Sequence, residues 1–428
     1  MKRSMVFGVG ILLGVSGCGG SDGGGGGNAA GAAGAASGGT SGVGATGGTG
    51  GAGGAAGAAG AGGAGGIAGA AGSGGAGGSS GSGAGGCVEV AAGAMHSCAL
   101  RADGSVACWG ANTKGQLGTG VLQPAPTPVP SAAGHVMKQL SAGYAHTCGL
   151  DGAGDAWCWG DKGQLGAAEN AASPKPLKVS GLAGATEVAA RIFHSCALKA
   201  DGTVACWGSN TYGGLGDGTK TSAPVPVAAK NVSTAAAVTA GLDFSCALGG
   251  DGKVRCWGYN SYGCLGDGGT VGSQLTPVEA KLPSAAAEIS GGGGHACAVL
   301  KTGALWCWGW NAYGQVGTKT PEIPAQVMAG GVAHVSAGGA HTCALETDGS
   351  LWCWGRNADG QVGNGAKEDV PAPTQVMTGV AQVSAGNWHT CALKTDGTVW
   401  CWGDGTDGQV GSGLAAAHLN PVQIAACE

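Results

Sequence analysis

Cysteine and histidine recur together along this chain at a spacing that could serve several kinds of chemistry. A His lies two residues before a Cys, and a second Cys follows ten residues after the first, as at His96, Cys98 and Cys108. Imidazoles and thiolates bind metals, a His can act as a catalytic acid or base, and paired Cys form disulfides. The choice among these depends on the elements that carry the residues.

The motif occurs seven times with a period near 49 residues, and Phe244 replaces the His in the fourth copy. The first Cys of the successive pairs are Cys98, Cys148, Cys196, Cys246, Cys297, Cys343 and Cys391. A fixed period of this length indicates an array of supersecondary units.

Each unit is expected to contain four short strands. A Val- or Ile-containing stretch is followed by His-x-Cys-Ala-Leu, an Asp-Gly turn such as that at Asp201, then Val-x-Cys-Trp-Gly and a Pro-Val stretch such as that at Pro226. Asp-Gly between two alternating apolar runs is typical of a β-hairpin. No segment shows sustained helical periodicity. Seven such units predict an all-β fold, a seven-bladed β-propeller of four-stranded blades.

The repeated phrase His-x-x-Ala-Leu, Asp-Gly-x-Val and Trp-Gly-x-Asn-x-x-Gly-Gln-Leu-Gly resembles the regulator of chromosome condensation (RCC-type) repeat over essentially all of 87–428. The resemblance implies the propeller fold. For function it implies several possibilities, because the family includes a nuclear exchange factor for the GTPase Ran, a secreted bacterial β-lactamase-inhibitory protein and many uncharacterised proteins. The paired Cys depart from the usual pattern of the family.

The two Cys of each hairpin lie symmetrically about the turn, which places Cys98 opposite Cys108 and Ser97 opposite Trp109. Directly opposed residues have Cα separations of about 4.5–5.5 Å, which suits a disulfide. The alternative, metal binding with the nearby His, would need seven metals, so no metal is expected. The predicted hairpin disulfides are Cys98–Cys108, Cys148–Cys158, Cys196–Cys206, Cys246–Cys256, Cys297–Cys307, Cys343–Cys353 and Cys391–Cys401.

Three further Cys lie outside the hairpins, apart from Cys18. Cys87 directly precedes the first strand of the first unit, and Cys427 directly follows the last strand of the seventh. A Cys87–Cys427 disulfide is predicted to close the ring where the backbone does not. Cys264 replaces Gln in the Gly-Gln-Leu-Gly loop, and a free thiol, an intermolecular bridge and an incidental buried Cys all remain open for it.

Signatures of catalysis are weak. The His recurs in six units whereas a catalytic His is needed once, so an interior hydrogen bond that orders each blade is expected instead, with the recurrent Trp packed between blades. The folded part has no Gly-x-Ser-x-Gly elbow, no His-Glu-x-x-His and no phosphate loop. A non-enzyme without a cofactor is predicted. A glycan hydrolase or lyase is the alternative, which converging carboxylates would favour; exchange-factor activity is a second alternative, by resemblance only.

The first residues resemble a bacterial lipoprotein signal. A basic start is followed by an apolar stretch, residues 5–15, that is too short to span a bilayer and ends in Val-Ser-Gly-Cys at Cys18. We expect a signal peptide over 1–17, a lipidated Cys18, and a disordered Gly/Ala-rich linker over 18–86, before the propeller at 87–428. With eighteen Cys in the chain, an extracytoplasmic protein of the bacterial cell envelope is predicted, which contacts the membrane through its lipid anchor only.

The connections between strands one and two and between strands three and four must emerge on the same face of a propeller. Large side chains at these connections suggest a recognition surface, although channel filling remains an alternative. The candidate residues are Tyr144, Phe193, Tyr259, Trp310, Arg356 and Trp388, whereas the recurrent Tyr212, Tyr262 and Tyr313 are expected to be structural. The formal charge of −5 argues against nucleic acid. The predicted function is a binding scaffold for an unknown protein, glycan or other macromolecule.

Overall fold

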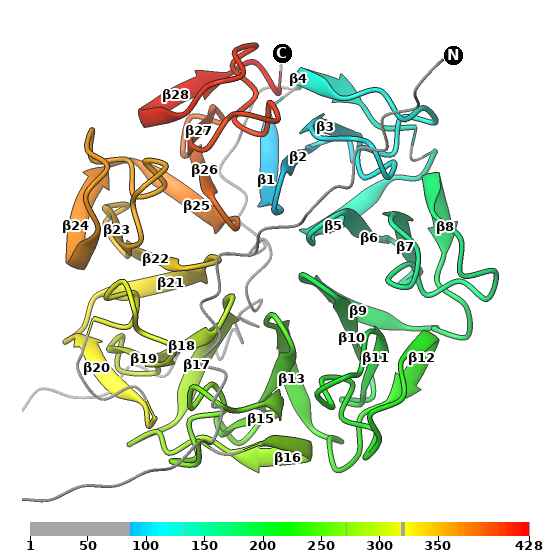
Figure 1. The fold of residues 1–428 in the computed structure, drawn as a ribbon, viewed down its shortest axis with the longest axis vertical. Helices are drawn as coiled ribbons and strands as arrows, with labels where there is room; N and C mark the ends of the chain where they lie inside the picture. Colours follow the sequence, from blue (N-terminus) through cyan, green and yellow to red (C-terminus); the bar gives the residue numbers. More distant parts are fainter. Residues whose placement is uncertain (1–85, 133, 271, 318–321, 428) are drawn as a thin grey trace, which may run out of the picture. The chain divides into compact units, whose positions relative to one another are not determined.

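The computed structural model describes residues 86–132, 134–270, 272–317 and 322–427. The regular structure in these ranges consists of strands, which form seven antiparallel sheets of four. The sheets, named blades 1 to 7 in chain order, surround a common axis, and consecutive strands of each blade follow one another outward (Figure 1). The predicted seven-bladed β-propeller is confirmed. The expected signal peptide, Cys18 and the linker up to residue 85 lie outside the described residues.

The four ranks of strands have similar lengths in every blade. The innermost are β1 (Cys87–Ala92), β5 (Met137–Ala142), β9 (Ala185–Ala190), β13 (Ala235–Ala240), β17 (Ala286–Gly291), β21 (Val332–Ala337) and β25 (Val380–Ala385). The second are β2 (His96–Arg101), β6 (His146–Asp151), β10 (His194–Lys199), β14 (Phe244–Gly249), β18 (His295–Leu300), β22 (His341–Glu346) and β26 (His389–Lys394). The third are β3 (Val106–Gly110), β7 (Ala156–Gly160), β11 (Val204–Gly208), β15 (Val254–Tyr259), β19 (Leu305–Gly309), β23 (Leu351–Gly355) and β27 (Val399–Gly403). The outermost are β4 (Ala125–Pro130), β8 (Ser173–Lys178), β12 (Ala223–Ala228), β16 (Ser273–Glu279), β20 (Ala325–Met328), β24 (Val370–Met377) and β28 (His418–Ile424).

The hairpin between the second and third strands has the register that the Cys spacing predicts. Cys98 pairs with Cys108, and Ser97 with Trp109. Asp and Gly form the turn of the first hairpin: Gly104 has a φ of +80°, and the backbone N–H of Ser105 donates to the Asp103 carboxylate at 2.8 Å. Blades 2 and 5 have Ala153-Gly154 and Thr302-Gly303 there, so only the Gly is common to all seven turns. Gly adopts positive φ without a steric penalty, and Asp stabilises such turns.

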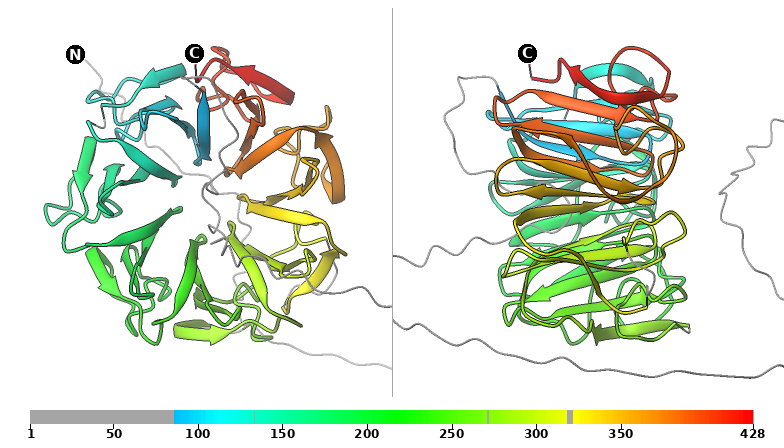
Figure 2. Two further views of the ribbon diagram at one scale, coloured as in Figure 1. Left: turned by 180° about the vertical axis from the view of Figure 1, so that it is seen from behind. Right: turned by 90° about the vertical axis from the view of Figure 1, so that its left-hand side faces the viewer.

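Burial separates the inner strands from the outermost ones. The second and third strands are buried almost throughout, whereas the outermost strands are mostly half-buried or exposed, and six of the seven contain Pro. Proline is tolerated at a sheet edge because its missing N–H removes no ladder bond there. The hydrophobic clusters lie between blades, and the one at the junction of blades 7 and 1 joins Val90 and Trp109 to Leu393 and Val399. The blades seen edge-on in Figure 2 are therefore held by their packed faces.

Disulfides join all eight Cys pairs named above. The Cα atoms of the hairpin pairs are 4.0–4.1 Å apart. Cys87 and Cys427, 340 residues apart in sequence, have Cα atoms 5.4 Å apart and link the first strand of blade 1 to the end of blade 7. Disulfides in this number indicate an extracytoplasmic location. In the described ranges, no helix has the length and apolar character needed to cross a membrane.

Candidate functional site

One face of the propeller carries both kinds of connection that the sequence singles out. Within a blade, a backbone N–H that follows the third strand donates to a carbonyl that precedes the second. Examples are Trp310 to Gly294 at 2.7 Å and Asp404 to Trp388 at 2.9 Å. These bonds hold the two connections side by side in every blade. We call this surface, made of the connections from strand one to two and from strand three to four, the loop face.

The six candidate residues for binding are all half-buried. The structure brings two of them together: the rings of Tyr144 in blade 2 and Trp388 in blade 7 meet edge to face, with centroids 6.2 Å apart. Since blade 1 lies between their blades, this contact must be close to the axis. Arg356 is held by its own loop, because its Nη1 donates to Asp359 Oδ2 at 2.7 Å.

Two others, Tyr259 and Trp310, belong to a row of five aromatic rings. The successive centroid distances along Tyr212, Tyr259, Tyr262, Trp310 and Tyr313 are 5.0, 5.9, 6.2 and 5.4 Å. The row follows the loop face over blades 3 to 5. We call these five residues the aromatic row.

The aromatic row contains the three Tyr that the sequence led us to regard as structural. Tyr212 and Tyr262 are 40% and 38% exposed, so they are not core residues. Across blades 1 to 7 the equivalent position holds Lys114, Lys162, Tyr212, Tyr262, Tyr313, Asp359 and Asp407. Because four blades fold with Lys or Asp there, the fold does not require an aromatic residue. Comparing the seven repeats at this position is the sequence signal that would have identified these Tyr as surface candidates.

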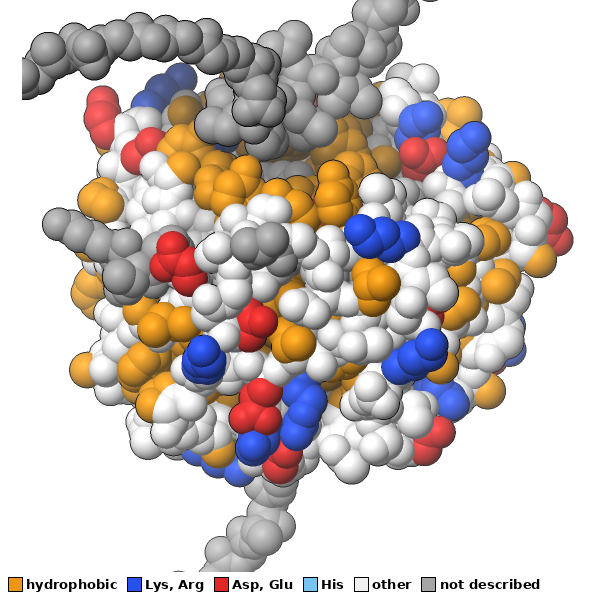
Figure 3. All heavy atoms as spheres, turned by 60° about the horizontal axis from the view of Figure 1, so that its bottom comes forward, with side chains coloured by type: hydrophobic (Ala, Val, Ile, Leu, Met, Phe, Trp, Pro, Cys, Tyr) orange, Lys and Arg blue, Asp and Glu red, His pale blue; other side chains and the backbone are white. Residues whose placement is uncertain are grey.

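Hydrophobic and charged side chains occupy different parts of the surface. In the view of Figure 3, hydrophobic side chains gather in the upper part, whereas Lys, Arg, Asp and Glu stand singly or in small groups of mixed sign below and around them.

The recurrent His makes an interior hydrogen bond, as expected, and the structure adds that its partner lies in the neighbouring blade. His146 Nε2 in blade 2 lies 2.9 Å from Ser195 Oγ in blade 3, and His96 Nε2 in blade 1 lies 2.8 Å from Thr147 Oγ1 in blade 2. Thr147 Oγ1 itself donates to the Gln116 carbonyl at 2.8 Å. A hydroxyl has one hydrogen, so the His must donate through Nε2. Sequence spacing did not reveal which blade holds the partner.

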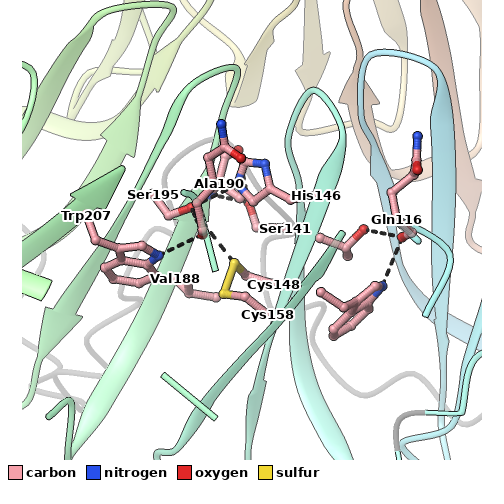
Figure 4. Close-up of a disulfide and its surroundings, with 12 residues drawn as sticks. Gln116, Ser141, His146, Cys148, Cys158, Val188, Ala190, Ser195 and Trp207 are labelled. Carbon is pink, nitrogen blue, oxygen red and sulfur yellow. Dashed lines mark hydrogen bonds between the residues drawn. A yellow bond between two sulfur atoms is a disulfide. The ribbon is translucent and has the colours of Figure 1, made fainter. Parts of the chain in front are cut away.

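The recurrent Trp also reaches across the junction, as expected from packing between blades. Trp159 Nε1 donates to the same Gln116 carbonyl, in the loop of the preceding blade, at 2.9 Å. Figure 4 shows this carbonyl together with His146, Ser195 and the Cys148–Cys158 disulfide. All seven junctions have the Trp bond, and Trp109 to the Gln409 carbonyl at 2.9 Å closes the ring.

The junction between blades 4 and 5 is built differently. Phe244 replaces the His, and Ala296 replaces the Ser or Thr that would have been its partner. Both belong to a buried cluster with Cys264. The Cys264 thiol donates to the Gly294 carbonyl at 3.1 Å, while its own carbonyl accepts from Trp308 Nε1 at 2.9 Å.

Burial decides the alternatives left open for Cys264. The side chain is fully buried and unbridged, which excludes the intermolecular disulfide for this conformation. Burial raises the pKa of its thiol to about 12. Cys264 is therefore a neutral, unreactive thiol that completes an altered junction.

The six recurrent His are neutral for electrostatic reasons as well. Burial lowers the pKa of His194 to about 4. Burial likewise lowers the pKa to about 3 for His96, His146, His295, His341 and His389. Groups held neutral and engaged at each junction are structural rather than catalytic.

Arg191 is a buried Arg that reaches across the inner end of the ring. Its position is Gly in the other six blades. At Gly338 a Cβ would lie 2.7 Å from the Gly386 carbonyl, so small residues are needed there. Arg191 extends from blade 3 to donate to the carbonyls of Ala337 in blade 6 and Ala385 in blade 7. Burial lowers the pKa of Arg191 to about 10, which leaves it charged near neutral pH.

Carboxylates come close together on the loop face in blade 7. Burial, and then the charge of Asp404, raises the pKa of Asp407. Asp404, however, is used by its own loop, because its Oδ1 accepts from Thr406 and its Oδ2 from Gln409. Among the described residues, no group of three His, Cys, Asp or Glu is placed to hold a metal ion.

Blade-spanning His and Trp bonds around a ring of 49-residue repeats define a repeat-built β-propeller. A model of the RCC1-like domain matches residues 161–428, and models of the regulator of chromosome condensation (RCC1) repeat match residues 87–116, 137–165 and 103–150. The chain belongs to the RCC1-like domain family. The comparison with curated protein sequences found no match.

Several solved structures have the same fold. Yeast RCC1 (Prp20), crystallised bound to Kap60, is 24% identical with a TM-score of 0.68, covering 75% of this chain and 83% of its own. Human WBSCR16 is 23% identical with a TM-score of 0.64, over 71% and 85% of the two chains. Prp20p from Saccharomyces cerevisiae is 22% identical with a TM-score of 0.63, over 70% and 80%. At these identities the likeness establishes the fold.

Proposed function

We propose that this protein is a non-enzymatic binding scaffold, displayed outside the cytoplasm, whose loop face binds a protein partner. The observation that carries the proposal is the set of aromatic side chains held half-exposed on the loop face, at positions that other blades fill with non-aromatic residues. Exposed Trp and Tyr give a large contact area with little loss of side-chain entropy. The solved relatives add that such a propeller can bind proteins, since yeast RCC1 was crystallised with Kap60.

A non-catalytic role fits the charges of the loop face. The two neighbouring carboxylates of blade 7 do not form a free acid–base pair, because Asp404 is engaged within its loop. Exchange-factor activity in the manner of the nuclear family member requires a cytosolic or nuclear partner, and the disulfides argue against that location.

The test of the loop face uses the Tyr144–Trp388 pair. Full-length protein and its Tyr144→Ala and Trp388→Ala variants are immobilised and incubated with native envelope extract, and the captured protein is then titrated. We expect each variant to bind at least tenfold more weakly, equivalent to about 1.4 kcal/mol, with an unchanged melting temperature. The control is Lys253→Ala on the hairpin side. A large fall in melting temperature would assign these aromatics to the core and remove the main support for the proposal.

Attachment to a membrane of the bacterial cell envelope through lipids on Cys18 is the second part of the proposal. The support is the sequence itself, a basic start and an apolar stretch that ends in Val-Ser-Gly-Cys. Labelling with radioactive palmitate should modify the mature protein, and Cys18→Ala should abolish both labelling and membrane retention. Undiminished membrane retention of the variant would contradict the anchor.

A further inference from the structure

The aromatic row is a second surface of the loop face, distinct from the Tyr144–Trp388 pair near the axis. It consists of Tyr212, Tyr259, Tyr262, Trp310 and Tyr313, which belong to three consecutive blades. The equivalent positions in the other blades show that folding does not demand these rings. The five rings are therefore better explained by binding to another molecule than by a requirement of folding.

The relative orientation of the rings restricts what can bind. Tyr212 and Tyr259 make an interplanar angle of 73°, Tyr259 and Tyr262 one of 67°, and Trp310 and Tyr313 one of 85°, whereas Tyr262 and Trp310 are inclined by 39°. Rings at such angles form notches rather than one flat platform. A glycan chain stacks its sugars on flat faces, whereas a notch between aromatic rings accepts a compact apolar ring such as the pyrrolidine of proline.

The spacing of the row matches an extended proline-rich chain. Steps of 5.0 and 5.9 Å place Tyr212 and Tyr262 no more than about 11 Å apart. A polyproline II helix rises about 3.1 Å per residue, so residues three apart are separated by roughly 9 Å. The same face of such a helix could therefore contact the equivalent Tyr of successive blades. The whole row, at most about 22 Å long, corresponds to roughly seven residues of this helix.

Charge narrows the partner further. The aromatic row contains no charged side chain, and the chain has a formal charge of −5. A proline-rich segment with basic rather than acidic flanking residues complements the negative net charge of the chain.

We propose that the aromatic row binds a proline-rich segment of a protein partner in the polyproline II conformation, with basic residues beside the prolines. This inference rests on the proposed protein-binding function and adds the chemistry of the bound segment. The aromatic row is separate from the Tyr144–Trp388 pair near the axis, so the two proposals can be tested independently.

The test measures binding of a fluorescein-labelled peptide, ten prolines with a Lys at each end, to the full-length protein by fluorescence polarisation. A peptide of alternating Gly and Ser with the same Lys residues is the peptide control. Tyr262→Asp introduces the side chain found at the equivalent Asp407, so the fold tolerates it. We expect the proline peptide to bind at least tenfold more tightly than the Gly/Ser peptide, and Tyr262→Asp to weaken it at least tenfold.

The matched control variant is Lys162→Asp. Lys162 occupies the equivalent position in blade 2, and its replacement by Asp changes the charge more than Tyr262→Asp does. If binding of the proline peptide depends on the aromatic ring and not on charge, the affinity of Lys162→Asp should stay within twofold of that of the unmodified protein. No binding of the proline peptide, equal binding of both peptides, or no effect of Tyr262→Asp overturns the proposal. Binding of chitohexaose or cellohexaose that Tyr262→Asp abolishes, without binding of the proline peptide, would assign the row to carbohydrate instead. If these assays fail while Trp388→Ala still reduces partner capture, the proposed function stands and only this inference falls.

Discussion

The six His at the junctions between blades are buried in the neutral form. Each donates Nε2–H to a Ser or Thr hydroxyl of the next blade, as His341 does to Thr390 at 2.8 Å. Protonating the ring would place a cation in a buried site, and burial therefore holds the pKa values at about 3 to 4. The same six groups titrate near 6.5 once the chain unfolds.

This difference predicts that acid weakens the propeller. Between pH 6.5 and about 4 the unfolded chain binds protons that the folded chain refuses, so the free energy of unfolding falls as pH falls. Each His contributes up to about 1.4 kcal/mol per pH unit. Burial raises the pKa of Asp243 to about 6 and that of Glu89 well above its usual range, and these two carboxyls offset part of the loss.

The measurement is guanidinium unfolding at pH 7.5, 6 and 5 with the disulfides intact. The double variant His146→Phe/Ser195→Ala introduces the Phe and Ala of the blade 4–5 junction, with Gln164 kept at the position of Cys264. It should show a shallower pH dependence, by about one titrating His. Unfolding free energies that are equal at pH 7.5 and 5 would show that the His are not held neutral.

At the scale of the structural element, the unit of assembly is the junction between blades. Six junctions use a His, a hydroxyl and a loop carbonyl, and one uses Phe244, Ala296 and Cys264. A His with a Ser or Thr satisfies its buried polar atoms, and Phe244 with Ala296 has no polar side-chain atom to satisfy. Combining the His of one kind of junction with the Ala of the other leaves a buried polar atom without a partner. An unsatisfied buried donor costs about 1–3 kcal/mol.

We predict that Phe244→His lowers the free energy of unfolding by about 1–3 kcal/mol, because the buried ring nitrogen has no partner. Adding Ala296→Thr should recover most of this loss, since the new pair then matches His295 and Thr342. A double-mutant cycle of unfolding free energies with Phe244→His, Ala296→Thr and the combination measures the coupling. The absence of recovery in the double variant would mean that backbone differences, not the side-chain pair, set this junction apart.

The sequence predicts what lies within one repeat better than what lies between repeats. The register of the hairpins follows from Cys pairs placed symmetrically about Asp-Gly, and Cys98 opposite Cys108 is as expected. The partner of His96 is Thr147, 51 residues away, and a pattern repeated in every blade cannot say whether it lies in the same blade or the next. The simultaneous loss of the His at Phe244 and of the hydroxyl at Ala296 was the available clue. Tyr259 and Trp310 of the aromatic row were predicted as binding residues, whereas Tyr212, Tyr262 and Tyr313 were not. The recurrence of Tyr at their position suggested a structural role, although four blades have no Tyr there.

For the whole molecule, the ring closes through side chains and one disulfide. Blades 7 and 1 meet through the Trp109 bond to the Gln409 carbonyl, the His389–Ser97 contact at 2.7 Å and Cys87–Cys427. The disulfide spans nearly the entire domain, which in the chain-entropy model gives an upper limit of about 6 kcal/mol, reduced by the seven inner bridges. The noncovalent contacts of this junction are of the same kind as those of the other five junctions that contain a His.

Removing the Cys87–Cys427 disulfide with Cys87→Ser/Cys427→Ser should therefore leave the ring assembled. Local opening of the junction between blades 7 and 1 should become more frequent. Amide hydrogen exchange should accelerate in β1 and β25 to β28 and remain unchanged in β13 to β16 on the far side. The comparison variant is Cys148→Ala/Cys158→Ala, whose effect should be confined to blade 2. Uniform acceleration throughout the ring would contradict a local role for the closing bond.

Each blade is a continuous stretch of chain, since no sheet borrows a strand from another repeat. The place where the polypeptide enters and leaves the ring is thus arbitrary with respect to folding. A circularly permuted gene, opened between any two other blades and joined by a short peptide between residues 87 and 427, would encode the same ring with the disulfide made redundant. Blades could likewise be exchanged between paralogous genes as whole cassettes, provided that each cassette carries the His or Phe and the Ser, Thr or Ala that its two neighbours require.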